Sequence, residues 1–158
     1  MSRGYFAVGL NTVKTPENVG HALRGCGVFG AAFLAFSGHR YRPHPTDTQR
    51  AVRHLPLMHF EDLHEAIPYD CVPVAVELTP FAVGLPTYTH PERAFYVFGA
   101  EDQTLGQQTL SWCRDVVYIP SARCLNLAAC VNVVLYDRCA KRCEWPERLP
   151  LPMRERVA

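Results

Sequence analysis

The sequence lacks the features that would place it outside ordinary globular proteins. It has no run of about 20 apolar residues, the length that a helix needs to cross a bilayer. Its N-terminus has no apolar stretch followed by a small-residue cleavage site, as a secretory signal would have. It also lacks internal repeats and Gly- or Ser-rich linkers. For its 158 residues we therefore expect one compact domain, located in the cytoplasm and without a membrane partner.

Disulfide and metal-binding patterns are absent as well. The seven cysteines are odd in number and form no C-x-x-C pair, so we expect reduced thiols. Three of the histidines, His54, His59 and His64, are spaced by five residues, which places them on different faces of a helix. Pro68 stands where an H-E-x-x-H motif would need its second histidine. The sequence thus predicts no metal site.

The common nucleotide-binding and acyl-transfer motifs are also missing: there is no G-x-G-x-x-G, P-loop, nucleophile elbow or kinase signature. What the chain does contain is a series of short apolar runs, mostly without strict alternation. Such runs are typical of strands that are covered on both faces, as in a parallel sheet. We expect strands at residues 5–10, 31–36, 55–60, 72–78, 94–98 and 116–119.

Helical segments are expected between these strands, at residues 19–26 with Asn18 as N-cap, at 62–66, at 104–113 and at 125–142. Strands that alternate with helices predict an α/β fold, a single domain with a mostly parallel sheet flanked by helices. Residues 38–53 are polar and contain proline, so we expect a mobile loop with one helical turn. Residues 143–158 are expected to form an extended C-terminal tail.

The net charge is only +1, but the charges are segregated along the chain. Basic residues concentrate in 39–54 and 138–158, whereas acidic residues concentrate in 55–110. The two basic segments are together a candidate RNA-binding footprint, because cations that the fold brings together can neutralise phosphates. A solvated surface is the alternative. The residues of this footprint are Arg40, Arg42, Arg50 and Arg53 in the first segment and Arg138, Lys141, Arg142 and Arg148 in the second.

Three groups of glycine and polar residues follow predicted strands, where open α/β sheets bind ligands. Gly99 lets a ligand approach the backbone without a Cβ in the way. Main-chain groups near Ile119 and Leu125 can bond a planar purine and its ribose. Glu101 and Asn126 are as well suited to capping a helix N-terminus as to contacting a ligand.

These residues resemble the motifs of the SpoU (TrmH-like) branch of the SPOUT RNA methyltransferases. The resemblance covers residues 5–142 and is strongest to the small TrmL-type tRNA members. Its first motif is N-x-G-x-x-x-R followed by F-G, its second is F-G-x-E, and its third is I-P followed by L-N-x-A. The matching residues are Asn18, Gly20, Arg24, Phe29 and Gly30; Phe98, Gly99 and Glu101; and Ile119, Pro120, Leu125, Asn126 and Ala128.

The resemblance implies a SPOUT domain over residues 1–142, with a C-terminal deep trefoil knot, that works as a homodimer. It implies transfer of a methyl group from S-adenosylmethionine to a ribose 2′-hydroxyl of RNA, with tRNA as the first expectation. Arg24 and Asn18 would be the catalytic residues, with Arg24 serving the cofactor of a neighbouring subunit. The cofactor site would comprise Leu78, Gly99, Glu101, Ile119, Cys124, Leu125 and Asn126.

Two positions depart from the family pattern. Cys124 stands where members commonly have serine, and a thiol is a weaker hydrogen-bond partner than a hydroxyl. Thr104 stands where a glycine is expected. Two alternatives therefore remain: a catalytically silent SPOUT-fold RNA-binding or assembly factor, and a methyltransferase that acts on a base nitrogen. The pattern from Asn18 to Arg24 favours ribose.

Overall fold

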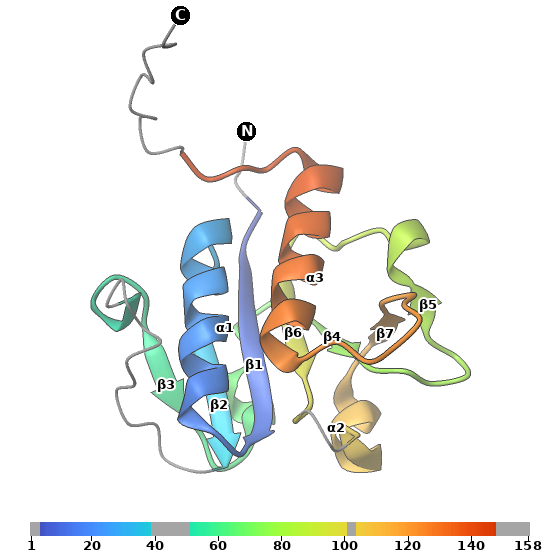
Figure 1. Cartoon of the computed structure of the whole chain (residues 1–158), viewed down its shortest axis with the longest axis horizontal. Coiled ribbons are helices and arrows are strands. Elements are labelled where there is room, and N and C mark those ends of the chain that lie inside the picture. The colour runs from blue at the N-terminus through green and yellow to red at the C-terminus, as the bar shows by residue number, and fades with distance from the viewer. Residues whose placement is uncertain (1–3, 39–50, 101–103, 148–158) are drawn as a thin grey trace, which may run out of the picture.

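The computed structural model describes residues 4–38, 51–100 and 104–147. Within them, strands alternate with helices along the chain (Figure 1). The strands are β1 (Phe6–Val13), β2 (Leu34–Gly38), β3 (Leu57–His59), β4 (Val72–Val76), β5 (Val83–Gly84), β6 (Ala94–Phe98) and β7 (Asp115–Tyr118). The α-helices are α1 (Pro16–Phe29), α2 (Gly106–Trp112) and α3 (Leu127–Arg142), and the 3-10 turns are η1 (Ala51–Arg53), η2 (Leu63–Ala66) and η3 (Leu85–Thr87).

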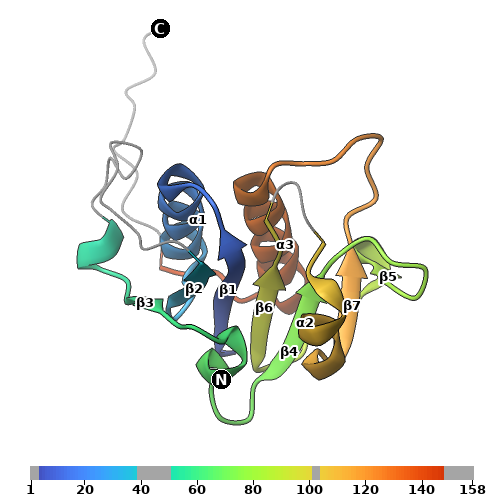
Figure 2. The ribbon, with the colours of Figure 1, turned by 90° about the horizontal axis from the view of Figure 1, so that it is seen from below.

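The seven strands form one sheet in the order β3-β2-β1-β6-β4-β7-β5, and every neighbouring pair is parallel. Figure 2 shows the sheet between two layers: α1 and α3 cover one face, and α2 lies on the other. The predicted α/β fold with a parallel sheet flanked by helices is therefore confirmed.

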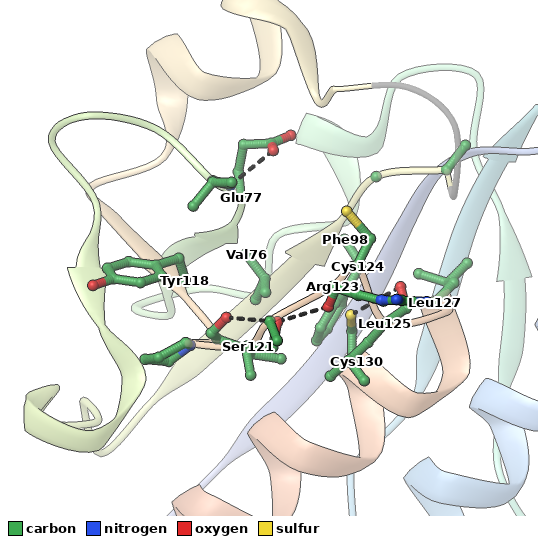
Figure 3. Close-up of a pocket in the computed structure, with 16 residues that line it drawn as sticks. Val76, Glu77, Phe98, Tyr118, Ser121, Arg123, Cys124, Leu125, Leu127 and Cys130 are labelled. Carbon is green, nitrogen blue, oxygen red and sulfur yellow. Dashed lines mark hydrogen bonds between the residues drawn. The ribbon is translucent and has the colours of Figure 1, made fainter.

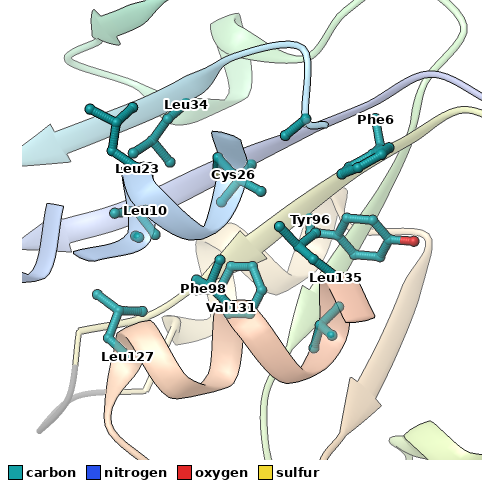
Figure 4. Packing of buried hydrophobic residues seen from close by; sticks show 14 of the residues in the cluster. Phe6, Leu10, Leu23, Cys26, Leu34, Tyr96, Phe98, Leu127, Val131 and Leu135 are labelled. Carbon is teal, nitrogen blue, oxygen red and sulfur yellow. The ribbon is translucent and has the colours of Figure 1, made fainter. Parts of the chain in front are cut away.

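The larger core lies between the sheet and the pair α1 and α3 (Figure 4). On α1, Leu23 and Cys26 are fully buried and three residues apart, so they lie on the same face of the helix. On α3, Val131 and Leu135 are fully buried and four residues apart, so they too lie on one face of their helix. The two helices pack closely at Gly25, where an added Cβ would meet the amide oxygen of Asn132 at 2.3 Å. This packing fixes the first half of α3 against the second half of α1.

The second core lies on the opposite face of the sheet. Phe95 and Val97 of β6 point into it and are fully buried, and Leu63 of η2 and Leu105 before α2 cover them. Because consecutive residues of a strand point to opposite faces, the uninterrupted apolar run of β6 serves both cores at once. This explains why the sequence shows short apolar runs without alternation.

Two local features differ from the sequence predictions. Helix α1 begins at Pro16 with Thr15 as its N-cap, so the prediction that Asn18 caps this helix is wrong; proline suits the first helical turn, where its missing N–H is no loss. Strand β5 has only two residues and was not predicted. The predicted helical turn before Arg53 is present as η1, while residues 39–50 lie outside the described part of the chain.

A buried arginine, Arg138, joins α3 to the sheet, so the prediction that it contributes to an RNA-binding footprint is wrong. The side chain of Arg138 is fully buried, and its guanidinium donates hydrogen bonds to the carbonyls of Pro91 (2.6 Å) and Glu92 (2.7 Å). It also lies 4.7 Å from the ring centroid of Phe6 and 3.7 Å from a carboxylate oxygen of Glu144. These contacts connect the segment that enters β6, the start of β1 and the end of α3.

We expect Arg138→Ala to lower the free energy of unfolding by about 3–5 kcal/mol, because it removes a fully buried side chain together with its hydrogen bonds to the carbonyls of Pro91 and Glu92. Denaturant unfolding measures this change. Arg114→Ala is the matched control: that side chain is 62% exposed and forms a surface ion pair with Asp115, so the loss should stay below about 1 kcal/mol. Equal losses in the two variants would contradict the assigned role of Arg138.

Candidate functional site

A cavity of about 590 Å³ opens at the carboxyl ends of β4, β6 and β7 (Figure 3). Its walls begin at the last residue of each strand and comprise residues 76–78 of β4, 98–100 of β6 and 118–125 of β7 with the segments that follow them. Leu127 and Cys130 of α3 close the cavity. These three segments meet because parallel strands all end at the same edge of a sheet. The volume lies within the range of about 300–1,000 Å³ that is usual for small-molecule sites.

The loop between β7 and α3 is folded on itself beside this cavity. The hydroxyl of Ser121 lies 2.9 Å from the carbonyl oxygen of Arg123 and 3.3 Å from that of Ile119. The thiol of Cys130 lies 3.8 Å from the carbonyl oxygen of Leu125. Short side-chain contacts of this kind stabilise a turn, so the main-chain groups of the loop are held beside the cavity.

Glu77 is a cavity residue that the sequence analysis did not identify. One carboxylate oxygen accepts a hydrogen bond from the backbone N–H of Leu78 at 2.8 Å, and the other accepts from the N–H of Leu105 at 2.8 Å. The side chain thus links the end of β4 to the segment before α2. An acidic residue directly after an apolar strand is the sequence signal that marks it.

Two thiols line the same cavity. Cys124 is exposed and Cys130 is half-buried. Burial raises the pKa of Cys130, and the nearby Cys124 thiol adds to the effect. Cys130 is therefore protonated at neutral pH, which makes it a packing residue and a poor nucleophile.

A separate polar groove of about 530 Å³ runs between α1 and the start of α3. Asn126 is the N-cap of α3: its side-chain oxygen accepts from the N–H of Ala129 at 2.7 Å. The side chain of exposed Arg24 forms neither a hydrogen bond nor an ion pair with the rest of the described chain. The polar residues that line the groove are Asn18, His21, Arg24, Asn126 and Asn132.

The structure divides the predicted site residues between these two places. The cavity holds Leu78, Gly99, Ile119, Cys124 and Leu125. The groove holds Asn18 and Arg24, and it also holds Asn126, which was expected at the cofactor. Leu125 and Leu127 face the cavity while Asn126, between them, faces the groove, so one short segment forms a wall of both.

Four of the predicted RNA-binding residues lie outside the described part of the chain, namely Arg40, Arg42, Arg50 and Arg148. The cofactor candidate Glu101 lies outside it as well. Arg53 is described; it is exposed at the end of η1, a turn that contacts α1. In the three described ranges, no helix is long and apolar enough to cross a membrane. The same ranges contain no group of three His, Cys, Asp or Glu residues that can hold a metal ion.

The fold and the site define a parallel α/β domain with a ligand cavity beyond the carboxyl ends of its strands and a polar groove beside it. A family model described as the SpoU rRNA Methylase family matches residues 5–136. The chain belongs to this family. No curated protein matches the sequence.

Solved structures share the fold at low sequence identity. The SpoU methyltransferase AviRb from Streptomyces viridochromogenes is 21% identical with a TM-score of 0.76; the match covers 90% of this chain and 61% of AviRb. A second AviRb structure is in complex with the cofactor AdoMet, with 20% identity, a TM-score of 0.76 and coverages of 92% and 61%. This chain thus spans less than two thirds of the length of AviRb.

Two further structures concern tRNA modification. The A. aeolicus TrmH/SpoU tRNA modifying enzyme is 17% identical with a TM-score of 0.80, and the match covers 90% of this chain and 77% of that one. A structure described in terms of the 2-OH methylation of C/U34 on tRNA is 20% identical with a TM-score of 0.76. That match covers 90% of this chain and 99% of the other.

We expect Glu77→Ala to loosen the mouth of the cavity, because the N–H groups of Leu78 and Leu105 lose their acceptor. Hydrogen exchange of these two amides should become faster while the amides of β6 remain protected. Glu61→Ala, which removes an exposed carboxylate from another part of the surface, is the matched control. Unchanged exchange at Leu105 in the Glu77 variant would rule out this link.

Proposed function

We propose that the protein is an S-adenosylmethionine-dependent RNA methyltransferase that modifies a ribose 2′-hydroxyl, in tRNA as the first candidate. The observation that carries the proposal is the ligand-sized cavity at three strand ends, with the groove that contains Arg24 adjoining it. Membership of the SpoU family and the AdoMet complex of AviRb support the methyl donor. The likeness to an enzyme of tRNA 2-OH methylation supports the acceptor, and tRNA as acceptor supports a cytoplasmic location.

The residues of the cavity suit this methyl donor. Apolar walls from Leu78, Ile119 and Leu125 can enclose an adenine ring, while main-chain groups of the loop after β7 can bond its edge. Gly99 lets the donor lie close to the end of β6. When bound, S-adenosylmethionine supplies an activated methyl group on a sulfonium.

Arg24 would act on the acceptor. Methyl transfer to a hydroxyl depends mainly on alignment of the reacting atoms, which can contribute roughly 7–11 kcal/mol. A guanidinium stays charged at all ordinary pH values. We therefore assign to Arg24 the orientation of a neighbouring phosphate and the stabilisation of charge that develops on the 2′-oxygen.

The proposed fold includes the trefoil knot of the family. Its support is the path of the chain: β7 lies beyond β4 in the sheet, yet the segment after it returns past the ends of β4 and β6 to reach α3 beside α1 (Figure 1). We assign the SPOUT domain to residues 1–142, as the motifs suggested. Residues 148–158 of the tail lie outside the described part of the chain.

We also propose a homodimer. The outer surfaces of α1, α3 and the segment after α3 expose large apolar side chains, namely Val28, Val133, Tyr136 and Trp145. Tyr136 packs edge-to-face with both Phe29 and Trp145. A contiguous aromatic surface of this kind marks a protein contact, and it adjoins the groove, so a second copy would bring its own cavity near Arg24.

We expect Arg24→Ala to abolish methyl transfer while its affinity for S-adenosylmethionine stays close to that of the wild-type protein, because Arg24 lines the groove and not the cavity. Transfer is measured with radiolabelled donor and RNA from cells that lack the protein, followed by nucleoside analysis; affinity is measured by calorimetric titration. Arg114→Ala is the control arginine. Retained transfer in Arg24→Ala would refute the assignment, and wild-type protein that binds no donor would favour a catalytically silent factor.

We expect Tyr136→Glu to convert the dimer to a monomer, because it places a charge in the apolar surface. Light scattering after size exclusion measures the mass. Tyr69→Glu introduces the same charge at a side chain that is 93% exposed on another part of the surface and should leave the dimer intact. A wild-type monomer at micromolar concentration would contradict the proposed assembly.

A further inference from the structure

His21 lies in the groove one helical turn before Arg24, and the family motif does not include it. The two residues are three positions apart on α1, so their Cβ atoms are about 5–6 Å apart on the same face of the helix. The His21 side chain is exposed and forms no hydrogen bond or ion pair within the described residues. Its imidazole is therefore available to a ligand in the groove.

The proposed reaction needs a group that takes up the hydroxyl proton. Arg24 cannot do so while it stays charged. The other polar side chains of the groove are the amides of Asn18, Asn126 and Asn132, which do not accept protons at ordinary pH. Imidazole accepts and releases protons near neutral pH, so His21 is the groove residue with the required chemistry.

We propose that His21 is the proton acceptor for the ribose 2′-hydroxyl, an inference that rests on the proposed function. As the 2′-oxygen forms its bond to the methyl carbon, the carbon–sulfur bond breaks and its electron pair stays on sulfur. The hydroxyl proton passes to the unprotonated imidazole nitrogen. The products are the methylated ribose, the neutral thioether and an imidazolium, which then loses its proton to solvent.

Among the described residues, few charged groups lie on the elements that surround His21. On α1, Glu17 lies one turn before it and Arg24 one turn after it. Helix α3 contributes only amides to the groove, and its first charged residue is Asp137, about three turns beyond Asn126. The turn η1, which contacts α1, contributes Arg53.

The test compares wild-type protein with His21→Gln, which keeps a polar side chain but cannot take up the proton. Single-turnover methyl transfer is measured from about pH 5.5 to 8.5 with saturating donor and RNA from cells that lack the protein. We expect the wild-type rate to rise with pH and reach a plateau, and the His21→Gln rate to fall by about 10²–10⁴-fold without this rise. His64→Ala, at an exposed histidine of η2, is the control and should behave as wild type.

A second variant separates chemistry from folding and binding. His21→Ala should bind S-adenosylmethionine and RNA as the wild-type protein does, and added imidazole should restore part of its rate. If the wild-type protein transfers the methyl group and His21→Gln stays within about threefold of it, the role of His21 is refuted while the proposed function stands. If the wild-type protein methylates no ribose, both fail.

Discussion

The parallel direction of all seven strands is the constraint on which the site depends. Because each strand runs the same way, the ends of β4, β6 and β7 lie at one edge, although 20 to 42 residues separate them along the chain. The cavity is built from the three segments that leave this edge. A single antiparallel strand among the three would carry one wall to the opposite edge, so the small-molecule site follows directly from the topology.

Helix α3 connects the cavity to the groove, because residues at its start line both. Its buried face is fixed against the sheet by Val131 and Leu135, its end by Arg138, and its flank by the close contact between Gly25 and Asn132. These contacts determine where the helix begins. The first residues of α3 can therefore form part of the cavity wall and part of the groove at the same time.

The sequence was sufficient for the elements that depend on continuous burial. The apolar runs of β1, β4 and β6 predicted strands covered on both faces, and two packed cores confirm this. The sequence did not predict β5, because a strand of two residues carries no recognisable pattern. It also misplaced the start of α1, because Thr15 and Asn18 are both good N-cap residues and Pro16, which suits the first helical turn, decides between them. Glu77 escaped notice because its partner, the N–H of Leu105, is 28 residues away and only the folded chain brings the two together.

The site was harder to anticipate for a related reason. Motif spacing identified residues of both the cavity and the groove, but it could not show that Asn126 turns away from its neighbours Leu125 and Leu127. This alternation has an evolutionary consequence. A substitution at one of these positions alters either the cavity or the groove, whereas deletion of one residue would turn cavity-facing side chains toward the groove and groove-facing ones toward the cavity. Loop length here should consequently be under stronger selection than residue identity.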